Sequence, residues 1–207
     1  MAGGKFITIE GGEGSGKTAQ AKLLADALRR LGRDVLLTRE PGGSPGAELI
    51  RTLLVTGTTK RWDGITEALL HYAARRDHVT STIKPALKKR KVVISDRFAD
   101  STLAYQGHGY GLPIKYIEAL HKITLASFQP DLTFILDLPV EIGLKRAKGR
   151  GGTEDRYERM DISFHDRIRK GFMSIAQGNP NRCFVINADR SAKTIHADIL
   201  QISHQRL

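Results

Sequence analysis

The sequence predicts an α/β fold in which a five-stranded parallel sheet is flanked by helices. Short apolar runs alternate along the chain with longer segments in which apolar residues recur every three or four positions. A glycine-rich motif connects the first apolar run to the first helical segment. Strands that alternate with helices are joined by crossover connections, which give a parallel sheet covered on both faces.

The predicted strands span residues 5–10, 34–38, 91–95, 131–137 and 182–187. The predicted helices span residues 18–31, 46–54, 65–89, 113–128, 139–148, 163–176 and 193–205. The first helix ends before Gly32, a residue type that commonly follows a helix C-terminus. We expect the long third helix to be irregular before Pro85.

Length and composition indicate one domain over residues 1–207, because no Pro-, Gly- or Ser-rich tract divides the chain. The N-terminus lacks the features of an export signal, and no stretch is apolar enough to span a bilayer. We therefore expect a cytoplasmic protein with no membrane partner. The single cysteine, Cys183, excludes an internal disulfide, and its apolar neighbours predict an inert core position.

The chain is basic, with 33 Lys and Arg against 22 Asp and Glu and a formal net charge of +11. Such a charge is compatible with a nucleic-acid-binding ATPase, which is the alternative from another functional class. Much of the excess lies in two clusters, at 84–91 and 145–159. The first is typical of a solvated helix end, and the second contains glycines suited to closing over a polyphosphate. We therefore expect no nucleic-acid partner.

Residues 11–18 read Gly-Gly-Glu-Gly-Ser-Gly-Lys-Thr, which matches the phosphate-loop pattern G-x-x-x-x-G-K-[ST] between a strand and a helix. Backbone N–H groups of such a loop, with the positive end of the following helix, bind phosphate oxygens. The motif predicts a fold of the phosphate-loop NTP hydrolase or kinase type. The expected nucleotide-binding residues are Gly11, Gly12, Glu13, Gly14, Ser15, Gly16, Lys17 and Thr18. Lys17 is expected at the β- and γ-phosphates, and the Thr18 hydroxyl at Mg²⁺.

Further polar residues lie where the predicted strands end, at Glu10, Arg39, Asp96 and Asp137. Ligands of open parallel sheets gather at this edge. A GTP-dependent switch would need an Asn-Lys-x-Asp sequence after a late strand, but the chain reads Asn-Ala-Asp-Arg at 187–190. The switch class is therefore disfavoured.

Three segments carry a family resemblance. They are Thr-Arg-Glu-Pro-Gly-Gly at 38–43, His-Tyr-Ala-Ala-Arg at 71–75, and Asp-Arg-Phe-Ala-Asp-Ser-Thr-Leu-Ala-Tyr-Gln at 96–106. Together they resemble the bacterial thymidylate kinases, a branch of the phosphate-loop nucleoside monophosphate kinases, over essentially the whole chain. The resemblance implies transfer of the γ-phosphoryl group of ATP to dTMP, for dTTP biosynthesis. We expect strand order 2-3-1-4-5 and a homodimer, with 65–89 and 113–128 as candidate interface helices. A kinase for another small acceptor is the nearest alternative.

The resemblance also implies roles at the acceptor phosphate. Arg97 holds that phosphate, and Asp96 lies near the metal with Thr18. Glu13 contacts the acceptor 3′-hydroxyl and Arg97. Either Arg39 or Arg51 is a further candidate, although Arg39 begins an Arg-Glu-Pro-Gly-Gly run that also reads as an ordinary turn. The full substrate-binding set is Glu13, Arg39, Glu40, Arg51, His71, Arg75, Arg97, Thr102, Tyr105 and Gln106.

Base recognition is assigned by the same resemblance to a helix face. Arg75 donates to the thymine carbonyl, and the residue four positions earlier stacks on the ring. Here that residue is His71 in place of the usual phenylalanine. We expect weaker stacking and a pH-sensitive site as the ring titrates. Alternatively, Tyr72 supplies the aromatic ring and His71 caps the pocket. The face lies about a quarter-turn from an expected core stripe of Ile65, Leu69 and Tyr72.

Three residues of the third segment complete this expected pocket. Thr102 and Gln106 hydrogen-bond the pyrimidine edge, and Tyr105 packs near the sugar 2′ position and disfavours a ribose hydroxyl. Ser101 is expected to cap a helix.

A glycine-containing basic segment at about 146–159 is expected to act as a mobile lid. The phosphate loop has no arginine, so the lid should supply a catalytic cation, with Arg150 preferred over Arg146 and Arg156. Glu158 is expected to orient the metal or anchor the lid. The predicted catalytic residues are Glu13, Lys17, Arg97 and Arg150. Adenine is expected between the lid-side arginines and the loop 187–191.

Overall fold

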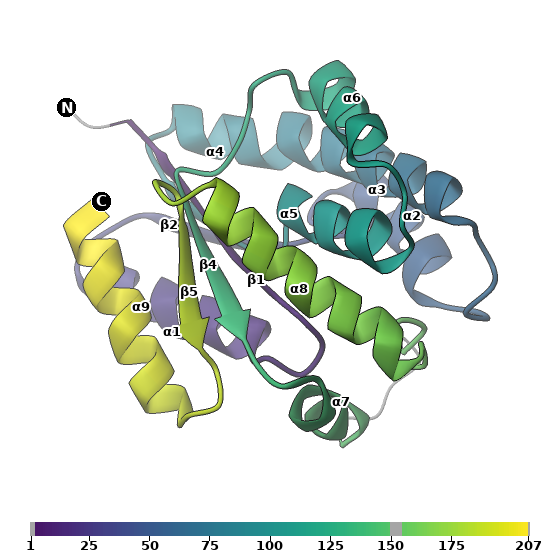
Figure 1. Cartoon of the computed structure of the whole chain (residues 1–207). Helices are drawn as coiled ribbons and strands as arrows, with labels where there is room; N and C mark the ends of the chain where they lie inside the picture. The colour runs from purple at the N-terminus through teal and green to yellow at the C-terminus, as the bar shows by residue number, and fades with distance from the viewer. Residues whose placement is uncertain (1–2, 150–154, 207) are drawn as a thin grey trace.

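The protein is described here by a computed structural model that covers residues 3–149 and 155–206 (Figure 1). Five strands form one sheet: β1 (Lys5–Gly11), β2 (Val35–Arg39), β3 (Val92–Asp96), β4 (Leu132–Asp137) and β5 (Cys183–Asn187). Every neighbouring pair is parallel, in the order β2-β3-β1-β4-β5. The predicted sheet and its order 2-3-1-4-5 are confirmed, and the strand bounds differ from the prediction by a residue at most ends.

Helices connect the strands: α1 (Lys17–Arg30), α2 (Pro45–Val55), α3 (Gly64–His78), α4 (Lys84–Lys88), α5 (Ala99–Thr102), α6 (Ile114–Leu125), α7 (Val140–Lys148), α8 (Ile162–Gly178) and α9 (Ala192–Arg206). Two π-helical segments, η1 (Val79–Ile83) and η2 (Leu103–Gly109), continue α3 and α5. The irregularity expected before Pro85 is therefore η1. Within 3–149 and 155–206, no helix is both long and apolar enough to cross a membrane.

The sheet is covered on both faces, as predicted. Ile7 and Ile9 of β1 pack in one core cluster with residues of α1 and α9. The other face carries Phe6 of β1, which packs with residues of α3, η1 and α6, while Ile135 of β4 packs with η2 and α8. Figure 1 shows α1 and α9 together on one side of the sheet and α8 on the other. Cys183 lies buried in the α8 cluster, as its sequence neighbours predict.

The strand ends place the site. Asp96 at the end of β3 is in register with Ile9 of β1 and with Arg39 of β2, so polar residues from several strands meet at one edge. Beyond β1 the chain turns through a glycine-rich loop into α1. Gly14 in this loop has φ of 67°, and a Cβ there would lie 2.0 Å from the Gly143 carbonyl oxygen of α7. Only glycine allows the loop to pass this close to α7.

The buried face of α3 differs from the predicted stripe. Ile65 and Leu69 are 54% and 51% exposed, whereas Glu67 and Arg75 are buried with Tyr72. The apolar pattern gave the wrong face because α3 buries two charged side chains, each paired with a residue from another part of the chain, Glu67 with Arg156 and Arg75 with Glu40. Those buried charges belong to the site described next.

Candidate active site

Two cavities adjoin above the carboxyl ends of the strands. The larger, of about 630 Å³, contains the phosphate loop with Lys17, Thr18 and Asp96. The smaller, of about 130 Å³, lies between α3, η2 and the segment at 157. Both are lined by Glu13, Glu40, Arg51, Arg97 and Glu158. A group bound in one cavity therefore reaches a group bound in the other across these five side chains.

Side chains of the phosphate loop hydrogen-bond to the backbone of the loop itself. Lys17 Nζ donates to the Gly12 carbonyl at 2.6 Å, and the Ser15 hydroxyl donates to the same oxygen at 2.9 Å. Burial and the nearby Arg97 lower the pKa of Lys17 to about 8. Thr18 Oγ1 donates to Asp96 Oδ2 at the mouth of the larger cavity. The two residues predicted at the metal are thus adjacent.

Arg97 and Glu13 form the junction of the cavities. Arg97 Nη2 donates to Glu13 Oε1 at 2.9 Å and to the Tyr105 hydroxyl at 2.9 Å. The Tyr105 hydroxyl in turn donates to Glu13 Oε1 at 2.7 Å. Arg97 has φ of 70°, and a positive φ at a non-glycine residue costs conformational energy and is found most often at functional sites. The predicted pairing of Glu13 with Arg97 is present.

The Glu13 carboxylate is held in its charged form. Burial alone would raise its pKa, but Arg97, Lys17 and the hydrogen bond from Tyr105 together lower the pKa of Glu13 to about 2. The negative charge inside the phosphate loop is therefore matched by two nearby cations, Arg97 and Lys17.

Arg75 lies in a buried ion pair. Its Nε donates to Glu40 Oε2 at 2.7 Å, and Nη2 donates to the Phe98 carbonyl at 3.1 Å. Glu40 Oε1 lies 3.0 Å from Nδ1 of His78, so Glu40, which lines both cavities, positions Arg75. Arg75 Nη1 is buried and has no hydrogen-bond partner among the described residues. Such an orphaned donor is costly unless a ligand uses it.

Gln106 and Thr102 carry orphaned atoms too. Gln106 lines the smaller cavity, and its Nε2 donates to Glu67 Oε2 at 2.9 Å, while Oε1 has no partner in the described chain. Thr102 Oγ1 is likewise buried and unpartnered there, but neither Thr102 nor Arg75 is among the described residues that line the smaller cavity. Ser101 is not a cap, because it lies inside α5 and donates to Glu10 Oε2 at 2.5 Å.

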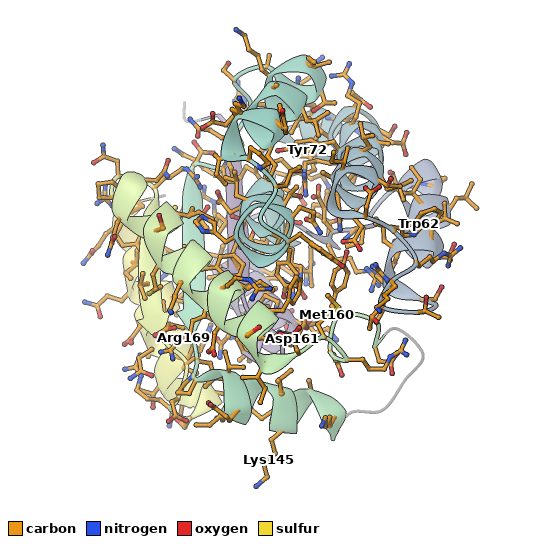
Figure 2. The ribbon with its side chains drawn as sticks, turned by 45° about the vertical axis from the view of Figure 1, so that its right-hand side comes forward. Trp62, Tyr72, Lys145, Met160, Asp161 and Arg169 are labelled. Carbon is orange, nitrogen blue, oxygen red and sulfur yellow. The ribbon has the colours of Figure 1, made fainter. Side chains whose placement is uncertain are left out.

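His71, and not Tyr72, lines the smaller cavity. Its Nε2 lies 3.2 Å from the Tyr157 hydroxyl, whereas Tyr72 lies under α6 with its ring edge-on to His121 (Figure 2). Burial, with Arg75, Arg97 and Arg156, lowers the pKa of His71 to about 3. The expectation that the ring titrates near neutral pH is therefore wrong, because the buried imidazole faces several cations.

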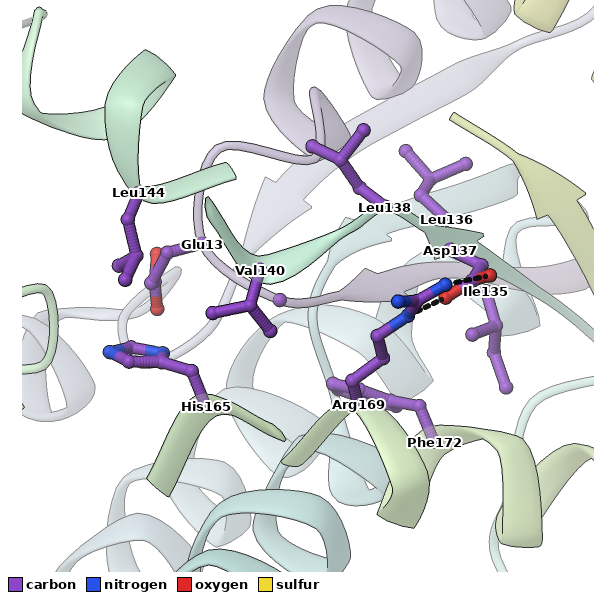
Figure 3. A pocket seen from close by; sticks show the side chains of 11 residues that line it. Glu13, Ile135, Leu136, Asp137, Leu138, Val140, Leu144, His165, Arg169 and Phe172 are labelled. Atoms are coloured by element: carbon purple, nitrogen blue, oxygen red, sulfur yellow. Dashed lines mark hydrogen bonds and ion pairs between the residues drawn. The ribbon is translucent and has the colours of Figure 1, made fainter. Parts of the chain in front are cut away.

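The two other arginines predicted to contact phosphate, Arg39 and Arg51, already hydrogen-bond to protein groups. Arg39 lines the larger cavity and pairs with Glu48 at 3.0 Å, with about half of its side chain exposed. Arg51 lines both cavities and donates to the Pro41 carbonyl at 2.6 Å. Asp137, another strand-end residue, is instead held by Arg169 through two hydrogen bonds of 2.7 and 2.9 Å behind the phosphate loop (Figure 3).

Two of the arginines predicted for the lid, Arg146 and Arg156, lie in the described residues on either side of 150–154. Arg146 belongs to the last turn of α7 and reaches the Ala188 carbonyl at 3.3 Å, next to the loop expected to hold adenine. Arg156 is 1% exposed and donates to the carbonyls of Leu54, Thr58 and Thr59 and to Glu67. It is therefore an anchor and not the second-choice catalytic cation. The preferred cation, Arg150, lies outside the described residues.

Sequence reasoning missed Glu67. This carboxylate is fully buried and accepts from Gln106, Tyr110, Arg156 and Tyr157. One signal could have found it, since Glu67 lies four residues before His71 and eight before Arg75 and so shares their helix face.

A phosphate loop that adjoins a second pocket across an arginine defines a phosphate-loop kinase with a small acceptor. A family model described as thymidylate kinase matches residues 9–199. The chain belongs to the thymidylate kinase family.

Individual relatives agree over the full length. The chain is 52% identical to a thymidylate kinase of Caulobacter vibrioides over 207 residues, which cover 100% of this chain and 99% of the relative. It is 49% identical to one from Afipia carboxidovorans, with 99% and 90% covered. A crystal structure of thymidylate kinase from Ehrlichia chaffeensis superposes with a TM-score of 0.78 at 38% identity, covering 98% of this chain and 99% of that one.

Proposed function

We propose that the protein transfers the γ-phosphoryl group of ATP to dTMP, giving dTDP and ADP, a step of dTTP biosynthesis. The single observation that carries the proposal is the junction of the two cavities at Arg97 and Glu13 in a chain of this family. Phosphoryl transfer requires two anionic groups to meet in line, and positioning with charge neutralisation supplies most of the catalysis.

At the junction, Arg97 holds the acceptor phosphate, with Glu13 and Tyr105 fixing the guanidinium. Arg51 and the more exposed Arg39 add positive charge beside it. Lys17 leaves the Gly12 carbonyl and binds the β- and γ-phosphates of ATP, while the loop N–H groups hold the same oxygens. The lid arginine, Arg150, remains a sequence prediction.

Mg²⁺ is part of the proposal. A hydroxyl and a carboxylate are the oxygen ligands that this ion prefers, and Thr18 and Asp96 present this pair beside the loop. The donor set therefore fits Mg²⁺ bound through one or two protein groups and the substrate phosphates. When bound, the ion neutralises charge on those phosphates.

The base lies in the smaller cavity. Gln106 Oε1 is a buried, unpartnered atom of a side chain that lines this cavity and bonds the pyrimidine edge, and His71 of the same lining stacks on the ring. Arg75 Nη1 and Thr102 Oγ1 are also unpartnered in the described chain, but their side chains do not line the cavity, so their contacts with the base stay sequence predictions. Tyr105 lines the same cavity, and its hydroxyl is bonded to Glu13 and Arg97. In the proposed complex this fixed ring packs against the sugar.

A homodimer is proposed on the exposed apolar residues of neighbouring helices. Leu49 of α2, Leu69 of α3 and Ile123 of α6 are 75%, 51% and 81% exposed, so these helices carry apolar side chains that a partner would cover. Sedimentation should give a dimer for the wild-type protein and a monomer for the Leu69→Glu variant.

A cytoplasmic location is also proposed, on the sequence grounds given above.

The test is ADP release with Mg-ATP and dTMP, dUMP, UMP, dCMP, AMP or dGMP as acceptor. We expect a preference for dTMP, with dUMP weaker by about 10–200-fold, because one methyl group is worth about 1–3 kcal/mol. Preferred activity on a different acceptor would leave the assignment as a kinase standing and would refute the assignment of the thymine pocket. ATP hydrolysis that is stimulated by DNA or RNA and falls steeply with salt would refute the kinase itself.

A further inference from the structure

Glu67 of α3 is a buried carboxylate that accepts from donors of two segments, 106–110 and 156–157. Its Oε1 accepts from the Tyr110 hydroxyl at 2.9 Å and from Arg156, and its Oε2 accepts from Gln106 Nε2 and the Tyr157 hydroxyl, each at 2.9 Å. Burial and the Glu67 charge raise the pKa of both tyrosines, so their hydroxyls stay protonated and donate. The carboxylate thus meets only donors.

This arrangement fixes which way the Gln106 amide points. A side-chain amide can turn over and exchange its NH₂ and its carbonyl oxygen, and its orientation is set by its hydrogen-bond partners. Glu67 Oε2 has lone pairs only, so it holds the NH₂ end of Gln106. The opposite end, Oε1, is buried and unpartnered among the described residues, in a side chain that lines the smaller cavity.

The end presented to the cavity decides which pyrimidine fits. Thymine and uracil carry an N–H donor at N3, which an amide oxygen accepts. Cytosine carries an unprotonated acceptor at N3, which would face the same oxygen and leave it unpaired. A site built to accept from an N3–H donor rejects a base with an acceptor at N3, because the buried polar groups of the site are then left without partners.

We propose that Glu67 is a positioning residue that selects pyrimidines with an N3–H donor over cytosine-type bases, by holding the Gln106 carbonyl toward the acceptor cavity. The inference rests on the proposed function of that cavity. It assigns to Glu67 a role in specificity through Gln106, without contact between Glu67 and the substrate.

Glu67→Gln tests the inference with little change in shape. The Arg156 guanidinium only donates, so the remaining carbonyl oxygen of the substituted side chain stays with Arg156. The new NH₂ then replaces Oε2 and faces the NH₂ of Gln106. Because two donors cannot bond each other, Gln106 turns over and presents NH₂ to the cavity.

The readout is the ratio of the dissociation constants for dCMP and dTMP, measured by calorimetry. In Glu67→Gln we expect this ratio to fall at least about tenfold, through weaker dTMP binding and tighter dCMP binding. A merely structural role would weaken both ligands alike and leave the ratio unchanged, and that result would overturn the inference.

Two further variants sharpen the test. Tyr110→Phe removes a donor from Oε1 and leaves the Gln106 contact at Oε2, so the ratio should stay within about twofold of wild type. In the charge-conserving double variant Glu67→Gln with Gln106→Glu, a carboxylate accepts from the new amide and still presents oxygen to the cavity. The double variant should therefore recover a preference for dTMP, and its failure to do so while folded would count against the inference.

The wild-type protein provides an independent measurement if Glu67→Gln does not fold. In the dTMP complex, NMR cross-peaks should connect the Gln106 NH₂ protons to the Tyr157 ring. Cross-peaks from those protons to the thymine ring instead would overturn the inference. If the wild-type protein binds dCMP as tightly as dTMP, the proposed function is refuted, because the protein then has no preference for thymine that Glu67 could support.

Discussion

Arg97 and Glu13 lie 2.9 Å apart, and both residues line the larger cavity with the phosphate loop as well as the smaller cavity. The pair joins an arginine from the chain after β3 to a carboxylate inside the phosphate loop, and Tyr105 bonds both members. The Arg97 guanidinium donates four hydrogen bonds, to the Gly11 carbonyl, Ser101, Glu13 and Tyr105. It therefore loses little freedom when a phosphate arrives, which favours precise placement of the acceptor.

Glu13→Gln should therefore damage acceptor use more than ATP binding. The amide keeps the shape but weakens the charge-assisted bonds that orient Arg97. We expect kcat/KM for dTMP to fall at least about tenfold, or about 1.4 kcal/mol, with the Kd for ATP changed by less than about threefold. Steady-state kinetics and calorimetry measure the two quantities, with the exposed Glu141→Gln as control. Equal losses for both substrates would contradict the role.

His71 gives a prediction on pH and stability. Burial lowers its pKa from 6.5 to about 3, so the unfolded state binds a proton that the folded state does not between these values. The free energy of unfolding should therefore fall as pH drops below about 6.5, by up to about 1.4 kcal/mol per pH unit from this residue. His71→Phe should remove that part of the fall.

Urea unfolding of both proteins between about pH 7 and pH 5 measures this difference. Parallel stability curves for wild type and His71→Phe would contradict the lowered pKa. Because the His71 ring stays neutral, it should add no pH dependence to dTMP binding. The KM for dTMP of wild type divided by that of His71→Phe should therefore be constant from about pH 6 to pH 8.

Cys183 should be unreactive in the folded protein. Burial and the nearby Asp100 raise the pKa of its thiol to about 12, and the thiolate is the reactive species. A thiol reagent at about pH 8 should modify the native protein at least about 100-fold more slowly than the same protein in denaturant. Rapid stoichiometric labelling of native, fully active protein would place Cys183 elsewhere than in the core.

The sequence was sufficient to predict the sheet because its strands are continuous apolar runs between helices of regular spacing. It did not predict α5 and η2, since the segment 99–109 contains glycines and little helical periodicity and is held by tertiary contacts. Among these, Glu10 accepts from the Phe98 N–H at 2.7 Å and from Ser101 at 2.5 Å. Tertiary bonds of this kind leave no local pattern in the sequence.

Part of the candidate site, like part of the fold, could be predicted from the sequence. The phosphate loop follows from a local motif, and the Arg97–Glu13 pair was implied by the family resemblance. Glu67 and Arg156 are 89 residues apart, and their pairing was not predicted. Glu67 looks like the solvated first turn of a helix, and Arg156 looks like part of a basic lid. Only the fold brings them together, and burial then converts two ordinary surface residue types into a paired core.

Arg156→Ala should test the anchoring role of that pair. The change leaves the buried Glu67 charge without its guanidinium and removes the donors to the carbonyls of Leu54, Thr58 and Thr59. Losing one partner of a buried ion pair costs about 3–5 kcal/mol. Arg159→Ala is the matched control, because its pair with Asp155 is about half exposed and such pairs contribute about 1 kcal/mol or less. Urea unfolding should separate the two variants by at least about 2 kcal/mol. If Arg156→Ala keeps wild-type stability and loses only kcat, Arg156 serves as the catalytic cation and not as the anchor.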